Sequence, residues 1–198
     1  LRRRQNAVSA PVRSRRTLLR VAGLSLGTLV GWQAIQRLAP SVRLPTGSKP
    51  TASFSANAFP AEIWLFDRVP VLDAATYRLA VFGQAFSLEQ LTSLHPPQDV
   101  QAVLDCTSGW WSEQVWSGPR VVDVLRTASI GADVQSVAFE STTGHRIVFA
   151  LADLEGAILA TRVGGETLSA GHGFPVRLVV PGWRGYHWVK WLASIDGR

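Results

Sequence analysis

One side chain can supply a thiolate, and its position suits contact with a cofactor. Cys106 is the only cysteine of the chain and follows the mainly apolar residues 100–104, which predict a strand. The small residues at 107–109 predict a turn, which presents a side chain while its backbone stays fixed. A lone cysteine also suits a small buried core residue. Acyl transfer would need a histidine and an acid or amide around the thiol, and the four histidines reveal no such set.

Two cations, Arg177 and Lys190, stand in apolar runs that predict strands over 176–180 and 188–195. Burial of an unpaired charge is costly, so each cation predicts an anionic partner. An aspartate or glutamate would make a structural ion pair. Glycine-flanked turns beside the two cations would equally suit a phosphate group. The residues alone leave both alternatives open.

Short strands and short helices must position these side chains. Pro119 suits the first turn of a helix through 121–125, and Ser87 with Gln90 has the spacing of a capping box. A further helix is predicted over 150–157. The remaining strands are predicted at 77–81, 134–139, 146–149 and 158–163. The pattern indicates a mixed α+β domain and no regular βαβ alternation.

The charge of the chain is strongly segregated. The net charge is +6, but residues 1–50 hold ten basic residues and no acid, whereas residues 51–198 hold ten basic and fourteen acidic residues. A nucleic-acid-binding protein would carry its basic surface on the folded domain, so we expect no nucleic-acid partner. A single cysteine excludes a disulfide framework, and core burial must supply the stability.

The basic excess at the N-terminus is explained by a membrane. Seven arginines precede sixteen uncharged residues, 21–36, which predict a hydrophobic helix with its N-terminal end in the cytoplasm. Residues 14–20 resemble a twin-arginine export signal, and the alternative is the last helix of a larger membrane protein. We therefore predict a membrane anchor or signal over 1–39, a linker over 40–56 and a globular domain over 57–198, which lies on the extracytoplasmic side of the cell membrane or in the periplasm.

Two sequence blocks carry a family resemblance. They are LDCTSGWWSEQVWSGPRVVDVL at 104–125 and GHGFPVRLVVPGWRGYHWVKWL at 171–192, with a weaker third, SANAFPAEIW, at 55–64. Together they resemble the molybdopterin-binding domain of the sulfite oxidase family of oxidoreductases. The resemblance implies an α+β, mixed-sheet fold of the sulfite oxidase type. It also implies a molybdenum-molybdopterin cofactor with one molybdenum and one pterin.

The same resemblance implies roles for individual residues. It makes Cys106 the catalytic residue and the protein ligand of the metal, which suits a soft thiolate. The residues that it places in contact with the pterin and its phosphate are Asn57, Ser141, His172, Arg177, Trp188, Val189 and Lys190.

The chain departs from the family where sulfite oxidases place arginines after the metal-bound cysteine. Here Trp110 and Trp111 occupy those positions, and core packing should explain at least one of the tryptophans at 110, 111 and 116. The resemblance thus predicts an aromatic, uncharged pocket mouth, as in bacterial periplasmic methionine sulfoxide reductases.

The implied function is oxygen-atom transfer, with reduction of a sulfoxide, N-oxide or similar small substrate outside the cytoplasmic membrane. Electrons would come from a redox partner such as a haem-containing membrane subunit or an upstream domain. The alternative is a non-catalytic cofactor-binding or assembly module with the same fold.

Overall fold

The structure is a computed structural model that describes residues 46–51, 55–63 and 67–198. The predicted N-terminal hydrophobic helix lies outside these residues, as does most of the predicted linker. Within the described ranges no helix has the length and apolar character that crossing a membrane requires.

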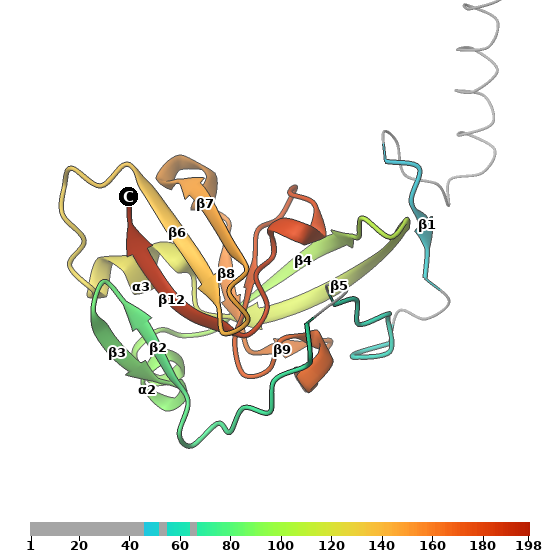
Figure 1. Cartoon of the computed structure of the whole chain (residues 1–198), viewed down its shortest axis with the longest axis horizontal. Coiled ribbons are helices and arrows are strands. Elements are labelled where there is room, and N and C mark those ends of the chain that lie inside the picture. The colour runs from blue at the N-terminus through green and yellow to red at the C-terminus, as the bar shows by residue number, and fades with distance from the viewer. Residues whose placement is uncertain (1–45, 52–54, 64–66) are drawn as a thin grey trace, which may run out of the picture. The chain divides into compact units, whose positions relative to one another are not determined.

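One sheet carries the strand that leads into Cys106 (Figure 1). The hairpin of β4 (Gln98–Asp105) and β5 (Trp110–Gly118) forms its centre, with Asp105 opposite Trp111. The short strand β1 (Lys49–Pro50) pairs with β5 in parallel, at Trp110 and Trp111. On the same side of β5, further along, lie β9 (Arg162–Val163) and β10 (Glu166–Thr167). The sheet therefore contains both parallel and antiparallel pairs.

A second sheet has the order β3-β2-β12-β6-β7. Its strands are β2 (Arg78–Val81), β3 (Gln84–Ser87), β6 (Ser136–Ser141), β7 (Arg146–Ala150) and β12 (Leu192–Gly197). Strand β12 pairs with β2 in parallel and with β6 antiparallel. The pair of β8 (Ile158–Ala160) and β11 (Arg177–Val179) is separate and antiparallel. Figure 1 shows β8 among the strands at the centre of the domain.

The helices of the described residues are short. Helix α2 (Leu88–Leu94) begins with the predicted capping box, because Ser87 Oγ accepts from the backbone of Gln90 and Gln90 Oε1 accepts from the backbone of Ser87. Helix α3 (Val121–Thr127) follows Pro119, also as predicted. The described part of the chain also contains the 3₁₀ helices η1 (Leu151–Leu154), η2 (Ala170–His172) and η3 (Gly185–His187). The mixed α+β prediction is confirmed.

Three local predictions were wrong. The helix over 150–157 is only the single turn η1, after which the chain enters β8. The strand expected over 188–195 begins at Leu192, so Lys190 lies in an irregular segment that includes Trp191 at a φ of 50°. The sequence analysis also missed β5, whose inward positions Ser112 and Gln114 are polar and buried. Because these inward residues are polar, the sequence of β5 shows no apolar alternation. Burial of the two side chains is helped by the hydrogen bond from Gln114 to Ser112.

Candidate functional site

Cys106 lies on a tight turn between β4 and β5. Its backbone N–H donates to the carbonyl of Trp110 over 2.8 Å, and its carbonyl accepts from Gly109 N–H over 3.1 Å. Gly109 has a φ of +88°, which a side chain would strain. The thiol is half-buried, with Sγ 3.6 Å from Ser108 Oγ. The prediction of a strand end and a small-residue turn is confirmed.

The thiol lines a cavity of about 210 Å³. Of the predicted cofactor-contacting residues, Ser141, Arg177, Trp188 and Lys190 line the same cavity, although they come from four parts of the chain. Asn57, His172 and Val189 do not line it. The fold thus gathers the thiol and both cations of interest around one space.

Arg177 is a buried cation in the wall of this cavity, with 2% of its surface exposed. Its guanidinium lies 5.1 Å from the ring centre of Trp116 and 5.7 Å from that of Trp188, and one amino group donates to the carbonyl of His172 over 3.2 Å. Its Nε has no hydrogen-bond partner among the described residues. Burial lowers the pKa of Arg177 to about 10, against a smaller opposing effect of Cys106.

Lys190 is the second cation of the cavity. Its Nζ donates to the carbonyls of Glu62, over 2.6 Å, and of Gly171, over 2.8 Å. Burial, and then the nearby charge of Arg177, lower the pKa of Lys190 to about 7. Among the residues that the structure describes, no carboxylate forms an ion pair with either cation. Two cations so placed call for an anion in the cavity, which favours the phosphate interpretation over a structural ion pair.

Gly173 permits the close approach of the two cations. It has a φ of +109°, and a Cβ there would stand 3.1 Å from the Cβ of Arg177 and 3.3 Å from that of Lys190. The glycine follows η2 in a left-handed conformation, which only glycine adopts readily. A side chain at this position would therefore strain the backbone and press on both cations.

His172 and Asn57 do not line the cavity, and the carbonyl of His172 accepts a hydrogen bond from the lining residue Arg177. The ring nitrogens of His172 contact Ser169 Oγ at 2.7 Å and the Phe59 carbonyl at 2.9 Å, and burial is the main cause that lowers its pKa to about 4. Asn57 donates to the carbonyl of Thr167 and accepts from the backbone of Ser169. Val189 is fully buried. Their predicted contacts with a pterin stay predictions.

Ser141 and Trp188 line the cavity, and their predicted contacts with a pterin stay predictions. Ser141 Oγ lies 3.1 Å from Thr143 Oγ1 at the end of β6. The indole of Trp188 donates to the carbonyl of Val180 and packs edge-on against Trp116. A ring fixed in this way makes a rigid wall.

The tryptophans after Cys106 have different roles. Trp110 lines the cavity and donates to Glu62 Oε1 over 3.3 Å, whereas Trp111 does not line it. Trp116 is fully buried, so the prediction that at least one tryptophan packs in the core is confirmed. The acidic residues Glu62 and Asp67 also line the cavity beside the aromatic residues, so its lining as a whole is not uncharged, and the predicted character of its mouth stays a prediction.

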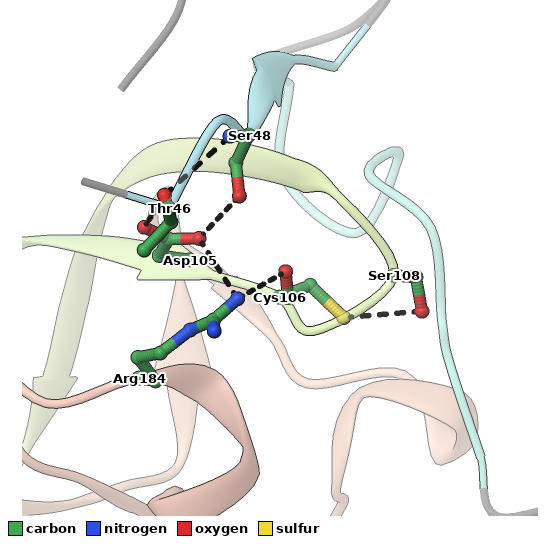
Figure 2. Close-up of polar contacts among 6 residues, drawn as sticks. All are labelled: Thr46, Ser48, Asp105, Cys106, Ser108 and Arg184. Atoms are coloured by element: carbon green, nitrogen blue, oxygen red, sulfur yellow. Dashed lines mark hydrogen bonds and ion pairs between the residues drawn. The ribbon is translucent and has the colours of Figure 1, made fainter. Parts of the chain in front are cut away.

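The sequence analysis missed the residues that surround the backbone of Cys106. Figure 2 shows Asp105 in contact with Thr46, Ser48 and Arg184, and Arg184 in contact with the Cys106 carbonyl. The only signal in the sequence is an acid at the end of an apolar strand, directly before the cysteine.

Comparison with known proteins agrees with this site. Residues 66–197 match the family described as the oxidoreductase molybdopterin binding domain. The chain belongs to the sulfite oxidase family of molybdopterin-binding domains. This family match contains Cys106 and the two cations, and it ends one residue before the C-terminus of the chain.

Relatives of this molybdopterin-binding domain include mitochondrial sulfite oxidases. The chain is 29% identical to that of Drosophila melanogaster over 197 residues, covering 80% of this chain and 34% of the relative. It is 35% identical to that of Mus musculus over 165 residues, covering 65% and 30%. A putative protein-methionine-sulfoxide reductase subunit, YedZ1, of Azospira oryzae is 29% identical over 155 residues, covering 73% and 56%. The domain thus spans about a third of the length of the sulfite oxidases that it matches.

A solved structure has the same fold. The sulfane dehydrogenase SoxCD from Paracoccus pantotrophus superposes with a TM-score of 0.61 at 24% identity, covering 65% of this chain and 40% of that chain. At this identity the likeness supports the mixed-sheet fold of the molybdopterin-binding domain and nothing further.

Proposed function

We propose that the chain is the catalytic domain of a molybdenum-dependent oxidoreductase that reduces a sulfoxide, an N-oxide or a similar small substrate. The observation that carries this proposal is the cavity in which the thiol of Cys106 faces two cations without a carboxylate partner among the described residues. These residues fit a molybdenum-pterin group, because a thiolate suits the metal and cations suit the pterin phosphate. When bound, the group supplies two-electron oxygen-atom chemistry.

Each residue of the cavity has a defined task in this proposal. Cys106 holds the metal by its thiolate, and Arg177 and Lys190 neutralise the phosphate. Ser141 and Trp188 line the space for the pterin. The buried Nε of Arg177, which lacks a partner in the described chain, gains one when an anion enters.

The cavity wall supports a neutral substrate. Trp110 and Tyr186 give it aromatic surface, and the carboxyl groups of Glu62 and Asp67 repel a dianion such as sulfite. Arg184, the remaining cation near the turn, bonds the carbonyl of Cys106 and does not line the cavity. A dianion entering this space would lose hydration without gaining a free cation.

The electron balance requires a partner. Reduction of a sulfoxide consumes two electrons and two protons and releases the sulfide and water. We propose that the electrons come from a separate redox partner, such as a haem-containing membrane subunit or an upstream domain. The word "subunit" in the name of the Azospira oryzae relative supports a partner of this kind.

We further propose that the domain works on the extracytoplasmic side of the cell membrane or in the periplasm. The arginine bias before the uncharged residues 21–36 supports this location. The proposed organisation is an anchor or export signal over 1–39, a linker over 40–56 and the oxidoreductase domain over 57–198, with the part of the linker at 46–51 paired with this domain through β1.

The test is to produce the full chain in a host that makes molybdopterin and to measure molybdenum, pterin and turnover with a reduced dye. We expect one molybdenum and one pterin per chain, and faster reduction of a sulfoxide or N-oxide than oxidation of sulfite. Bound pterin without any turnover would indicate the non-catalytic module instead. Efficient sulfite oxidation would show that the substrate proposal is wrong.

A further inference from the structure

The short strand β1 lies against the turn that carries Cys106, although residues 46–51 fall outside the part of the chain that matches the family. The backbone N–H of Lys49 donates to the carbonyl of Gly109 over 2.9 Å. That of Thr51 donates to the carbonyl of Trp111, also over 2.9 Å. Strand β1 therefore holds the outgoing side of the turn by its main chain.

The incoming side of the turn is held by side chains. Asp105, the last residue of β4, is 5% exposed, and its carboxylate accepts from Ser48 Oγ over 2.6 Å and from Thr46 Oγ1 over 2.9 Å. Ser48 is itself fully buried. A buried carboxylate is tolerated only when it is hydrogen-bonded or paired, and the two hydroxyl groups just before β1 supply such hydrogen bonds to Asp105.

Arg184 connects this carboxylate to Cys106 itself. One amino group of its guanidinium lies 3.8 Å from Asp105 Oδ1 and donates to the carbonyl of Cys106 over 3.3 Å (Figure 2). The next residue, Gly185, lies so close that a Cβ there would stand 2.7 Å from Leu104 Cδ1 and 3.2 Å from the Asp105 carbonyl. Arg184 is thus held against the backbone on which the thiol depends.

Neither Asp105 nor Arg184 lines the cavity. Successive side chains of an extended strand point to opposite faces, which places the carboxylate of Asp105 away from the space that Cys106 faces. These residues therefore do not touch a substrate or a pterin in that cavity. Their contacts act on the orientation of Cys106.

We propose that Asp105 and Arg184 are positioning residues for Cys106, and that Thr46 and Ser48, which directly precede β1, hold Asp105 in place. This inference rests on the proposed function, in which Cys106 binds the metal. Groups behind a metal ligand fix its orientation and tune the metal that it holds. The segment through which the chain enters the domain, residues 46–51, is thus hydrogen-bonded to Asp105, which directly precedes the proposed metal ligand Cys106.

The first test uses the full chain without cofactor, so that it does not depend on metal binding. Hydrogen exchange is measured on the peptide that covers residues 105–111 in Arg184→Gln and in the double variant Thr46→Val/Ser48→Ala. We expect exchange roughly twofold to tenfold faster in both, the factor by which loss of a net hydrogen bond shifts a local opening equilibrium. The matched control is Arg126→Gln, which removes the exposed ion pair with Asp123 on α3 and should leave this peptide unchanged.

The second test separates positioning from general stability. In the molybdenum-loaded protein, Arg184→Gln should alter the Mo(V) electron paramagnetic resonance spectrum and lower turnover by about tenfold or more. Arg184→Lys keeps a cation for Asp105 and a donor for the carbonyl, and should restore the wild-type spectrum. The Arg126→Gln control should show the wild-type spectrum throughout.

Wild-type exchange and a wild-type spectrum in Arg184→Gln and in the double variant would overturn the inference. If Arg184→Gln did not fold, the double variant would decide, since it removes only hydroxyl groups. A wild-type chain that took up no pterin would instead refute the proposed function. The exchange measurement without cofactor would still show whether β1 and Arg184 hold the turn.

Discussion

Replacement of Arg177 by methionine distinguishes a cofactor cation from a structural one. The substitution removes a charge that is 2% exposed and keeps most of the volume between Trp116 and Trp188. In the protein without cofactor, the lowered pKa of Arg177 means that burial of the charged guanidinium reduces the free energy of unfolding. The cost is about 3 kcal/mol, at about 1.4 kcal/mol for each tenfold change in the ionisation constant.

Opposing contributions offset most of that cost. The two indole contacts contribute about 1–2 kcal/mol together, and the hydrogen bond to the His172 carbonyl about 1 kcal/mol. We therefore expect Arg177→Met without cofactor to lie within about 1 kcal/mol of the wild type in free energy of unfolding. Loss of one partner from a buried structural ion pair would cost about 3–5 kcal/mol instead.

Two measurements decide the question. Urea unfolding followed by tryptophan fluorescence gives the stability without cofactor, and pterin content after expression in a molybdopterin-producing host gives the binding. Pterin content should fall about tenfold or more, because charge-assisted hydrogen bonds contribute about 1.5–3 kcal/mol. Arg146→Met on β7, where the arginine is exposed, is the control and should change neither. A loss of 3 kcal/mol or more with full pterin content would refute the reasoning.

Three further predictions test the site and the fold. Cys106→Ser should fold, lose turnover and lose or alter the Mo(V) resonance, and normal turnover would exclude a metal-binding role. The folded pKa of Lys190 is lowered to about 7, so its unfavourable charge is fully present below that pH and is relieved as the pH rises. The free energy of unfolding of the cofactor-free protein, measured in urea, should thus rise by at least about 1 kcal/mol between pH 6 and 9. Lys190→Met should lack this rise. Gly118→Ala should destabilise the domain by more than about 3 kcal/mol in the same assay, because the new Cβ would stand 2.0 Å from the backbone oxygen of Leu159. A smaller loss of stability would mean that β5 and β8 can separate there.

Local patterns predicted the parts of the fold that local physics determines. The capping box at Ser87 is satisfied within three residues of sequence, and the strand before Cys106 has a mainly apolar stretch at 100–104. Both were confirmed. Strand β5 was missed because its inward residues Ser112 and Gln114 are polar, which removes the apolar alternation that indicates a half-buried strand.

The strand predicted around Lys190 was wrong for a different reason. The run 188–192 is apolar around a single lysine, which predicts a strand. In the structure Trp191 has a φ of 50° and its indole donates to the carbonyl of Ala170, so the chain leaves the extended conformation until Leu192. Tertiary contact outweighs the local preference here. The irregular backbone turns Lys190 toward the cavity that Arg177 also lines.

The cavity was recognisable from the sequence only through the family blocks. The surroundings of Cys106 combine residues that are 57 to 59 positions apart, Thr46 and Ser48 with Asp105, and a further contact from Arg184. No periodicity or spacing rule relates such distant residues. Their association follows from the pairing of β1 with β5, which a single sequence does not reveal.

The charged side chains around Cys106 differ in the partners that the protein gives them, and this difference supports an external anion at Arg177. One residue before the cysteine, the chain surrounds the buried carboxylate of Asp105 with two hydroxyl donors and a guanidinium. On the cavity side, the described chain provides Arg177 and Lys190 with carbonyl oxygens and no carboxylate ion pair, and both pKa values are lowered. A ligand that binds only the native state stabilises it in proportion to its binding energy. Cofactor uptake should therefore stabilise this domain most through the two cations that form no carboxylate ion pair within the described chain.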